Sequence, residues 1–195
     1  MDIFIGQDCG IETGGICINR NGLLEYYMTP KDSSGKIDLE AITKNIYSLI
    51  IDIASQGGGT LVYTVEDVHS IFGSSASSNF SFGRRRGEPD AIAASVKTSL
   101  EMLGPWNVKM VYYTPKAPEW QKKIVEFIDQ VREKGKLDTK KTSIKCAMRL
   151  FPGYSFTKPG RGARVPQDGL TDSALICEYG RRKFLGILDK KTSFE

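Results

Sequence analysis

The sequence opens on a short apolar run that ends in a carboxylate. Residues 3–5 (Ile-Phe-Ile) are consecutive strand formers without a polar break, a pattern typical of a strand buried on both faces. The run continues through 6–10 (Gly-Gln-Asp-Cys-Gly), so Asp8 follows the point where the strand should end. Gly10 would let the chain turn away at a positive φ. Such a segment also fits an ordinary turn, in which Asp8 accepts local backbone hydrogen bonds.

Strand and helix patterns alternate along the rest of the chain. Two strand-like runs, 14–18 and 23–28, flank an Asn-Gly pair, which is a strong hairpin signal. A helical pattern begins after Asp38, a candidate N-cap, and an apolar strand over 60–65 ends at Glu66. Later expectations are a Ser/Gly-rich loop over 70–83, a helix over 90–103 with Pro89 in its first turn, a strand over 106–113, and helices over 120–134, over 139–150 and from 168. This order predicts one α/β domain over residues 1–195, with a mixed central sheet flanked by helices.

The composition narrows the class of protein. The 195 residues, 40% of them hydrophobic, suffice for one well-buried domain, and the net charge of +4 is compatible with a polyanionic partner. The four cysteines lack paired metal spacing and His69 is the single histidine, so a zinc site is not expected. Reduced core thiols, no membrane span and no signal pattern favour a cytoplasmic protein.

Two further acids stand one helical turn apart. Asp168 and Asp172 would lie on one face of a helix. Asp168 is also explained as an N-cap, with Asp172 near the positive end of the helix dipole. If the strands that end in Asp8 and Glu66 are parallel neighbours, these acids meet at one sheet edge. Oxygen ligands suit Mg²⁺ or Mn²⁺, and two such ions about 4 Å apart can assist phosphodiester cleavage.

The segments around these acids also resemble a known family. They are Ile5–Gly10, Val65–Asp67 and Asp168–Gly180, together with Leu150–Pro152 and Phe80–Arg84. In this order, across nearly the whole chain, they resemble the RuvC-type Holliday junction resolvases, above all the smaller phage and bacterial members. The resemblance implies a ribonuclease H-like fold, a homodimer, and Mg²⁺-dependent paired nicking of opposing strands of a four-way DNA junction.

The resemblance also implies roles for single residues. Asp8, Glu66, Asp168 and Asp172 match the four metal-binding acids, which would hold two Mg²⁺ ions per active site, with Mn²⁺ as a substitute. Lys141 matches a lysine near the scissile phosphate. A junction-stacking aromatic of some members falls here at His69, with Phe72 close by. The expected DNA contacts are His69, Phe72, Arg84, Arg85, Lys140 and Lys141.

Two other functions fit parts of the pattern. An actin- or sugar-kinase-like ATPase of the same superfamily also ends its first strand in Asp-x-Gly, but it needs a second Gly-rich phosphate loop. The glycines at 57–59 precede the strand over 60–65 and are poorly placed for that role. A non-catalytic module that binds DNA junctions would not need all four acids, which are present here.

Overall fold

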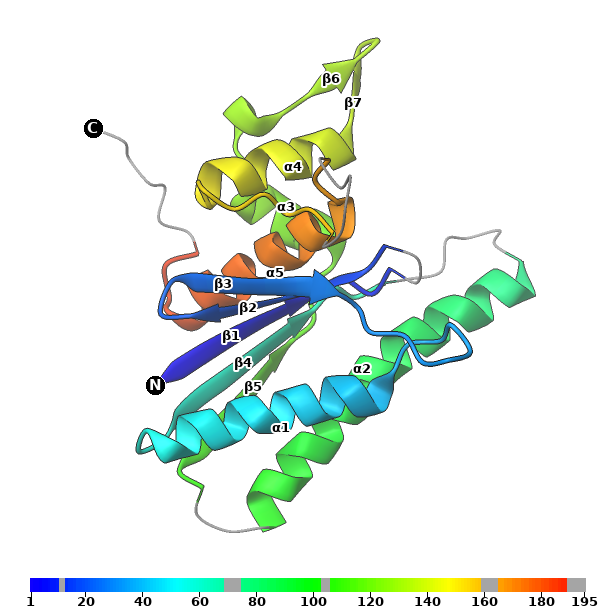
Figure 1. Cartoon of the computed structure of the whole chain (residues 1–195). Helices are drawn as coiled ribbons and strands as arrows, with labels where there is room; N and C mark the ends of the chain where they lie inside the picture. The colour runs from blue at the N-terminus through cyan, green and yellow to red at the C-terminus, as the bar shows by residue number, and fades with distance from the viewer. Residues whose placement is uncertain (11–12, 69–74, 103–105, 159–164, 189–195) are drawn as a thin grey trace.

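A central mixed sheet carries helices on both faces (Figure 1). The computed structural model of the chain describes residues 1–10, 13–68, 75–102, 106–158 and 165–188. The five sheet strands, in the order β3-β2-β1-β4-β5, are β1 (Asp2–Gln7), β2 (Gly15–Arg20), β3 (Leu23–Met28), β4 (Gly59–Val65) and β5 (Val108–Tyr113). The helices are α1 (Leu39–Ser55), α2 (Ala76–Met102), α3 (Ala117–Ile124), α4 (Thr139–Leu150) and α5 (Asp168–Phe184), with a 3₁₀ turn η1 (Phe127–Asp129). A separate hairpin consists of β6 (Arg132–Glu133) and β7 (Lys136–Leu137).

The strand directions confirm the predicted fold class. β1, β2 and β3 form an antiparallel meander, whereas β4 runs parallel to both β1 and β5. Asn21 and Gly22 both have positive φ in the β2–β3 turn, as the Asn-Gly pair predicts. This is an α/β structure with a mixed central sheet flanked by helices.

The central strand is buried on both faces because each face of the sheet has its own core. Ile3 and Ile5 of β1 pack with apolar residues of α1 and α2. Phe4, which points to the other face, packs with residues of α3, α4 and α5. Figure 1 shows α1 and α2 below the sheet and α5 above it, with α3 and α4 beyond α5. The unbroken apolar run in β1 thus reflects helices on both sides.

α5 approaches β1 so closely that the two backbones touch at Gly6. A Cβ atom on Gly6 would lie 2.1 Å from the Ser173 carbonyl oxygen and 2.3 Å from the Cys177 nitrogen. The side chain of Cys177 contacts β1 as well, because its thiol donates a hydrogen bond to the Phe4 carbonyl at 3.3 Å. The approach holds the first turn of α5 beside the end of β1.

Three expectations about local structure were wrong. α2 begins at Ala76, and Pro89 lies inside it rather than in its first turn. All its buried residues lie from Pro89 onward, so its first half has no apolar stripe that could mark it as a helix. Segment 120–134 is not one helix, because α3 ends at Ile124 and the β6–β7 hairpin follows. Gly10 does not have a positive φ; it is needed because Gly14 lies close to it.

The cysteine prediction is confirmed. Cys9, Cys17, Cys146 and Cys177 are all free and buried. Within the segments that the structure describes, no helix has both the length and the apolar character that crossing a membrane requires.

The contact at Gly6 predicts a large stability effect. Gly6→Ala should lower the free energy of unfolding by about 3 kcal/mol or more, because the added methyl group meets backbone atoms of α5 that cannot move independently. Urea denaturation of the purified variant measures this. Gly83→Ala is the matched control, since nothing lies within 4 Å of its Cβ position in α2. There the change should be neutral or stabilising by up to about 1 kcal/mol. Equal stability of the two variants would contradict the close packing of β1 on α5.

Candidate active site

Four acidic side chains come together where β1 and β4 end and α5 begins. Gln7 pairs with Val65 in the parallel β1–β4 register, so Asp8 and Glu66 follow neighbouring strand ends. The Glu66 backbone N–H donates to the Gln7 carbonyl at 3.2 Å. Figure 1 shows the ends of β1 and β4 and the beginning of α5 on the same side of the molecule. The expected parallel neighbours are therefore present.

Local hydrogen bonds and ion pairs orient two of these acids. Asp8 accepts a hydrogen bond from the Gly10 N–H at 3.1 Å, so the turn suggested by the sequence forms. The N-cap of α5 is Gln167 and not Asp168. The Asp168 carboxylate instead lies 2.7 Å from the Lys140 ammonium of α4. The capping role therefore does not explain Asp168.

The shifted pKa values show that the charges of these acids influence one another. Burial raises the pKa of Asp8 to about 6, and the neighbouring Asp168 charge raises it further, against the Gly10 hydrogen bond and the charges of Arg85 and Lys140. Burial raises the pKa of Glu66 to about 7, with repulsion from Asp8 and Asp172 adding to it.

The pKa of Asp172 is shifted for the same reasons. Burial raises its pKa to about 7, and both Asp8 and Asp168 contribute repulsion. Its Oδ1 atom is buried and accepts no hydrogen bond from any residue that the structure describes. A buried carboxylate oxygen normally accepts a hydrogen bond or contacts a cation. Asp172 Oδ1 is therefore suited to bind a donor or a positive charge.

The residues fit a cation in donor type. Carboxylate oxygens are the preferred ligands of Mg²⁺ and Mn²⁺, and Asp172 Oδ1 is an acceptor without a partner. Across the described residues, however, no three His, Cys, Asp or Glu side chains already form a group that could hold a metal ion. The carboxylates influence one another through charge, and the Lys140 ammonium already sits against one of them.

The two adjacent lysines at the start of α4 point to different partners. Lys140 contacts Asp168, as described. Lys141 pairs with Glu133 of β6, and its ammonium lies 3.8 Å from the Asp138 carboxylate. Asp138 is also the N-cap of α4. The structure thus brings Lys140 to the acids and places Lys141 toward the β6–β7 hairpin.

Two residues that lie beside the acids were not predicted from the sequence. The Ser143 hydroxyl of α4 lies near enough to the Asp172 carboxylate to lower the pKa of that carboxyl. The Trp120 indole N–H lies near enough to Glu66 to lower the pKa of that carboxyl, but it lacks hydrogen-bond geometry. Trp120 is fully buried. No spacing in the sequence links either residue to the acids.

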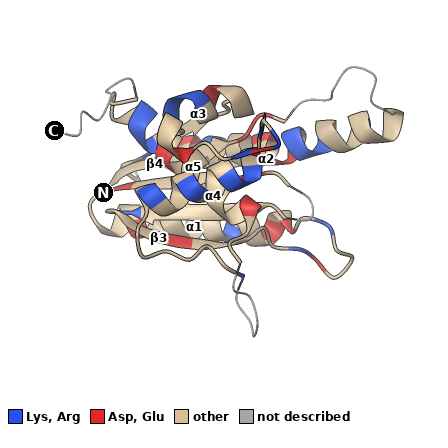
Figure 2. Ribbon diagram, turned by 90° about the horizontal axis from the view of Figure 1, so that it is seen from above, with Lys and Arg blue, Asp and Glu red and all other residues tan. Residues whose placement is uncertain are grey.

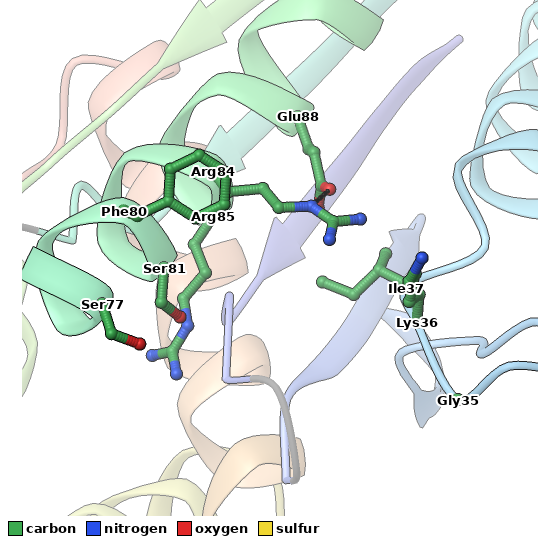
Figure 3. Close-up of a pocket in the computed structure, with 9 residues that line it drawn as sticks. All are labelled: Gly35, Lys36, Ile37, Ser77, Phe80, Ser81, Arg84, Arg85 and Glu88. Atoms are coloured by element: carbon green, nitrogen blue, oxygen red, sulfur yellow. Dashed lines mark hydrogen bonds and ion pairs between the residues drawn. The ribbon is translucent and has the colours of Figure 1, made fainter.

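A basic cleft lies beside the acids, between α2 and the loop before α1 (Figure 3). Arg84 turns toward Glu88 and pairs with it, whereas Arg86 pairs with Asp67 and Asp90. Arg85 points in another direction and lies over the Phe82 ring, with 5.4 Å between its Cζ atom and the ring centroid. The cleft has a volume of about 240 Å³ and is lined by Gly35, Lys36, Ile37, Ser77, Phe80, Ser81, Arg84, Arg85 and Glu88.

Arg85 is the arginine of this group whose charge reaches the acids. It forms no ion pair with any residue that the structure describes, and it lowers the pKa of Asp8. In Figure 2, both α2 and α4 carry Lys or Arg segments. His69 and Phe72, the other expected DNA contacts, lie outside the described residues.

No family model and no curated protein matches the sequence. Two solved structures similar to the chain are both of RuvC from Thermus thermophilus. RuvC in complex with a Holliday junction substrate has a TM-score of 0.44 and 12% identity, covering 96% of this chain and 98% of that one. A second RuvC structure has a TM-score of 0.42 and 13% identity, covering 95% and 97%. At these values the similarity by itself assigns no activity to this chain.

The raised carboxyl pKa values predict how stability depends on pH without divalent cations. An acid whose pKa is higher in the folded state than its ordinary value stabilises the fold while protonated, and this contribution is lost as the pH rises through about 4 to 7. Asp172→Asn removes one such charge. With EDTA present, the variant should exceed wild type in free energy of unfolding by about 1–3 kcal/mol at about pH 8, and by much less at about pH 5. Urea denaturation at both pH values tests this. A difference in free energy of unfolding that does not change with pH would contradict the raised pKa of Asp172.

Proposed function

We propose that this chain is a Mg²⁺-dependent endodeoxyribonuclease that resolves four-way DNA junctions by nicking two opposing strands. The observation that carries the proposal is a set of charge interactions at one sheet edge. Asp168 raises the pKa of Asp8, and Asp8 in turn raises the pKa of both Glu66 and Asp172. The sequence resemblance of the segments around them to RuvC-type resolvases supports branched DNA as the substrate.

The acids have the chemistry that a pair of hard cations requires. Asp8, Glu66, Asp168 and Asp172 would hold two Mg²⁺ ions, and Mn²⁺ would substitute for them. When bound, such a pair supplies an activated water and charge stabilisation at the leaving oxygen. The Gly10 N–H orients the Asp8 carboxylate, and the Ser143 hydroxyl lies beside that of Asp172. These orienting contacts come from the protein alone.

Basic side chains around the acids would bind the phosphates of the DNA. Lys140 places an ammonium 2.7 Å from the Asp168 carboxylate, where it would also face an incoming phosphate. Arg85 brings a second charge from α2 on the other side of the site. Such contacts release counterions and give affinity that falls with salt. Lys141, Arg84, His69 and Phe72 remain proposed contacts further along the DNA.

Paired nicking requires two active sites, because a four-way junction presents two equivalent opposing strands. A homodimer would supply them through a two-fold axis. This assembly is part of the proposal and is drawn from the resemblance to the RuvC-type resolvases.

The ATPase alternative is disfavoured by the position of its required loop. Gly58 and Gly59 lie at the start of β4, at the opposite end of that strand from Glu66. The Gly58 N–H donates to the Ile53 carbonyl at 3.0 Å, and the Gly59 N–H donates to the Asn107 carbonyl at 3.0 Å. These backbone groups bind other parts of the protein and are not available for a phosphate.

The binding-module alternative leaves the acid cluster unexplained. Keeping acids with pKa values near 6 and 7 close together opposes folding at neutral pH. A protein that only binds DNA would gain nothing from such an arrangement, since it repels phosphates.

The acid cluster predicts separate effects on cleavage and binding. Wild type with Mg²⁺ should nick a labelled four-way junction at symmetric positions. Asp8→Asn should lower the cleavage rate by at least about a hundredfold and leave junction binding nearly unchanged, because it removes an ion ligand and keeps the fold. Gel analysis of the nicks and a binding titration measure the two effects. Binding without nicks by wild type would support the binding module, and ATP hydrolysis would support the ATPase.

The neighbouring lysines allow a matched comparison. Lys140→Ala should lower cleavage by about 10- to 100-fold with a much smaller loss of junction binding, because it removes the cation beside Asp168. Lys141→Ala removes the same charge one residue away, beside Glu133. If Lys141 is the lysine near the scissile phosphate, as the resemblance implies, Lys141→Ala will have the larger effect on cleavage, and the role given to Lys140 is wrong. Equal losses of cleavage and binding in both variants would reduce both lysines to general DNA contacts.

A further inference from the structure

A second cavity is lined by residues of α3, α4 and the hairpin strand β7. It is open to solvent on one side and has a volume of about 320 Å³. Its lining combines amide, hydroxyl and ammonium groups with two apolar side chains, Val125 and Leu137. The polar lining residues are Gln121, Lys122, Gln130, Thr139, Thr142 and Ser143. No acidic residue lines it.

The cavity and the acid cluster share parts of their walls. Ser143 lines the cavity, and its hydroxyl lies near enough to the Asp172 carboxylate to lower the pKa of that carboxyl. Ser143 is therefore the residue that links the cavity to the proposed reaction centre.

The groups that line the cavity differ in whether the protein already uses them. The Thr142 hydroxyl accepts a hydrogen bond from the Val131 N–H at 3.0 Å, which fixes the inner wall. The Gln121 amide, the Lys122 ammonium and the Thr139 hydroxyl have no hydrogen bond or ion pair with any residue that the structure describes. A polar cavity with several unused donors and acceptors has the character of a ligand site.

We propose that this cavity receives the nucleobase next to the phosphodiester bond that the acid cluster hydrolyses, and that Gln121 and Gln130 read its hydrogen-bonding edge. The inference rests on the proposed function, and it extends that function to the choice of cleavage sequence. The shared wall at Ser143 places the base and the reacting phosphate in adjoining spaces.

The chemistry of the lining favours a base over other ligands. A glutamine amide presents a donor and an acceptor side by side, which is the pattern that base edges complement. The single cation, Lys122, suits one phosphate of a strand and is insufficient for a di- or triphosphate. Bases at a branch point are less stably stacked than those in a duplex, so moving one into a cavity costs less there.

The first test reads the cleavage sequence. Four-way junctions with randomised bases around the branch are cut by wild type, Gln121→Ala, Gln121→Glu and Gln56→Ala, and the cut sites are sequenced. Gln56 is the control, an exposed glutamine at the C-cap of α1. Gln121→Ala should weaken a base preference of wild type by at least about fivefold at one flanking position. Gln121→Glu keeps the shape but only accepts, so it should shift the preference toward the base whose exposed Watson–Crick edge donates most, guanine with its N1–H and N2–H groups. Cleavage with four identical sequence profiles would overturn the base site and leave the nuclease proposal standing.

The second test needs no cleavage, so it separates failure of this inference from failure of the proposed function. Asp8→Asn is saturated with junctions that carry 2-aminopurine at single positions around the branch, with Ca²⁺ in place of Mg²⁺. The fluorescence of one flanking position should rise as that base leaves the stack, and adding Gln121→Ala should reduce the rise by about half or more. The same signal without any nicking by wild type would support the cavity and refute the nuclease. Saturated binding without a rise at any position would overturn the base site, and the absence of binding to any DNA would overturn both proposals.

Discussion

Where β1 passes under α5, Gly6 leaves no side chain between the two backbones, and the Cys177 thiol binds the Phe4 carbonyl. This contact sets how far the first turn of α5 lies from the end of β1. Asp8 belongs to one of these segments, and Asp168 and Asp172 belong to the other. Glu66 joins them through the parallel pairing of β1 with β4. Backbone packing therefore positions four side chains that are far apart in the sequence.

The same packing creates an electrostatic cost. Burial raises the pKa of Asp8, Glu66 and Asp172 before any mutual repulsion is counted, and repulsion among the acids raises it further. Lys140 and Arg85 offset part of this cost, and both are basic groups that would also bind phosphate. One oxygen of Asp172 is left without a partner. The buried carboxylates thus make the fold less stable than neutral side chains would. They also provide a set of oxygens suited to a hard cation.

The parts of the fold that were predicted correctly are those specified by local chemistry. Asn21 and Gly22 form the β2–β3 turn because both adopt positive φ, and Asp38 caps α1 by accepting from the Ala41 N–H at 2.9 Å. The first half of α2 was missed because its residues bury no apolar stripe. The hairpin after α3 was missed because Lys134 and Gly135 turn the chain with positive φ in a segment whose charges mimic a helical repeat.

The sequence by itself determined the strands of a mixed sheet, the β2–β3 hairpin, and which acids follow strand ends or begin a helix, because these features can be read from neighbouring residues. Only the tertiary structure decided which lysine meets Asp168, since adjacent helical residues point about 100° apart and nothing local says which direction faces the site. It also decided that Trp120 and Ser143 border the acids and that a polar cavity adjoins them. Those relations depend on how α3, α4 and α5 pack together, and packing between distant segments leaves no local pattern in the chain.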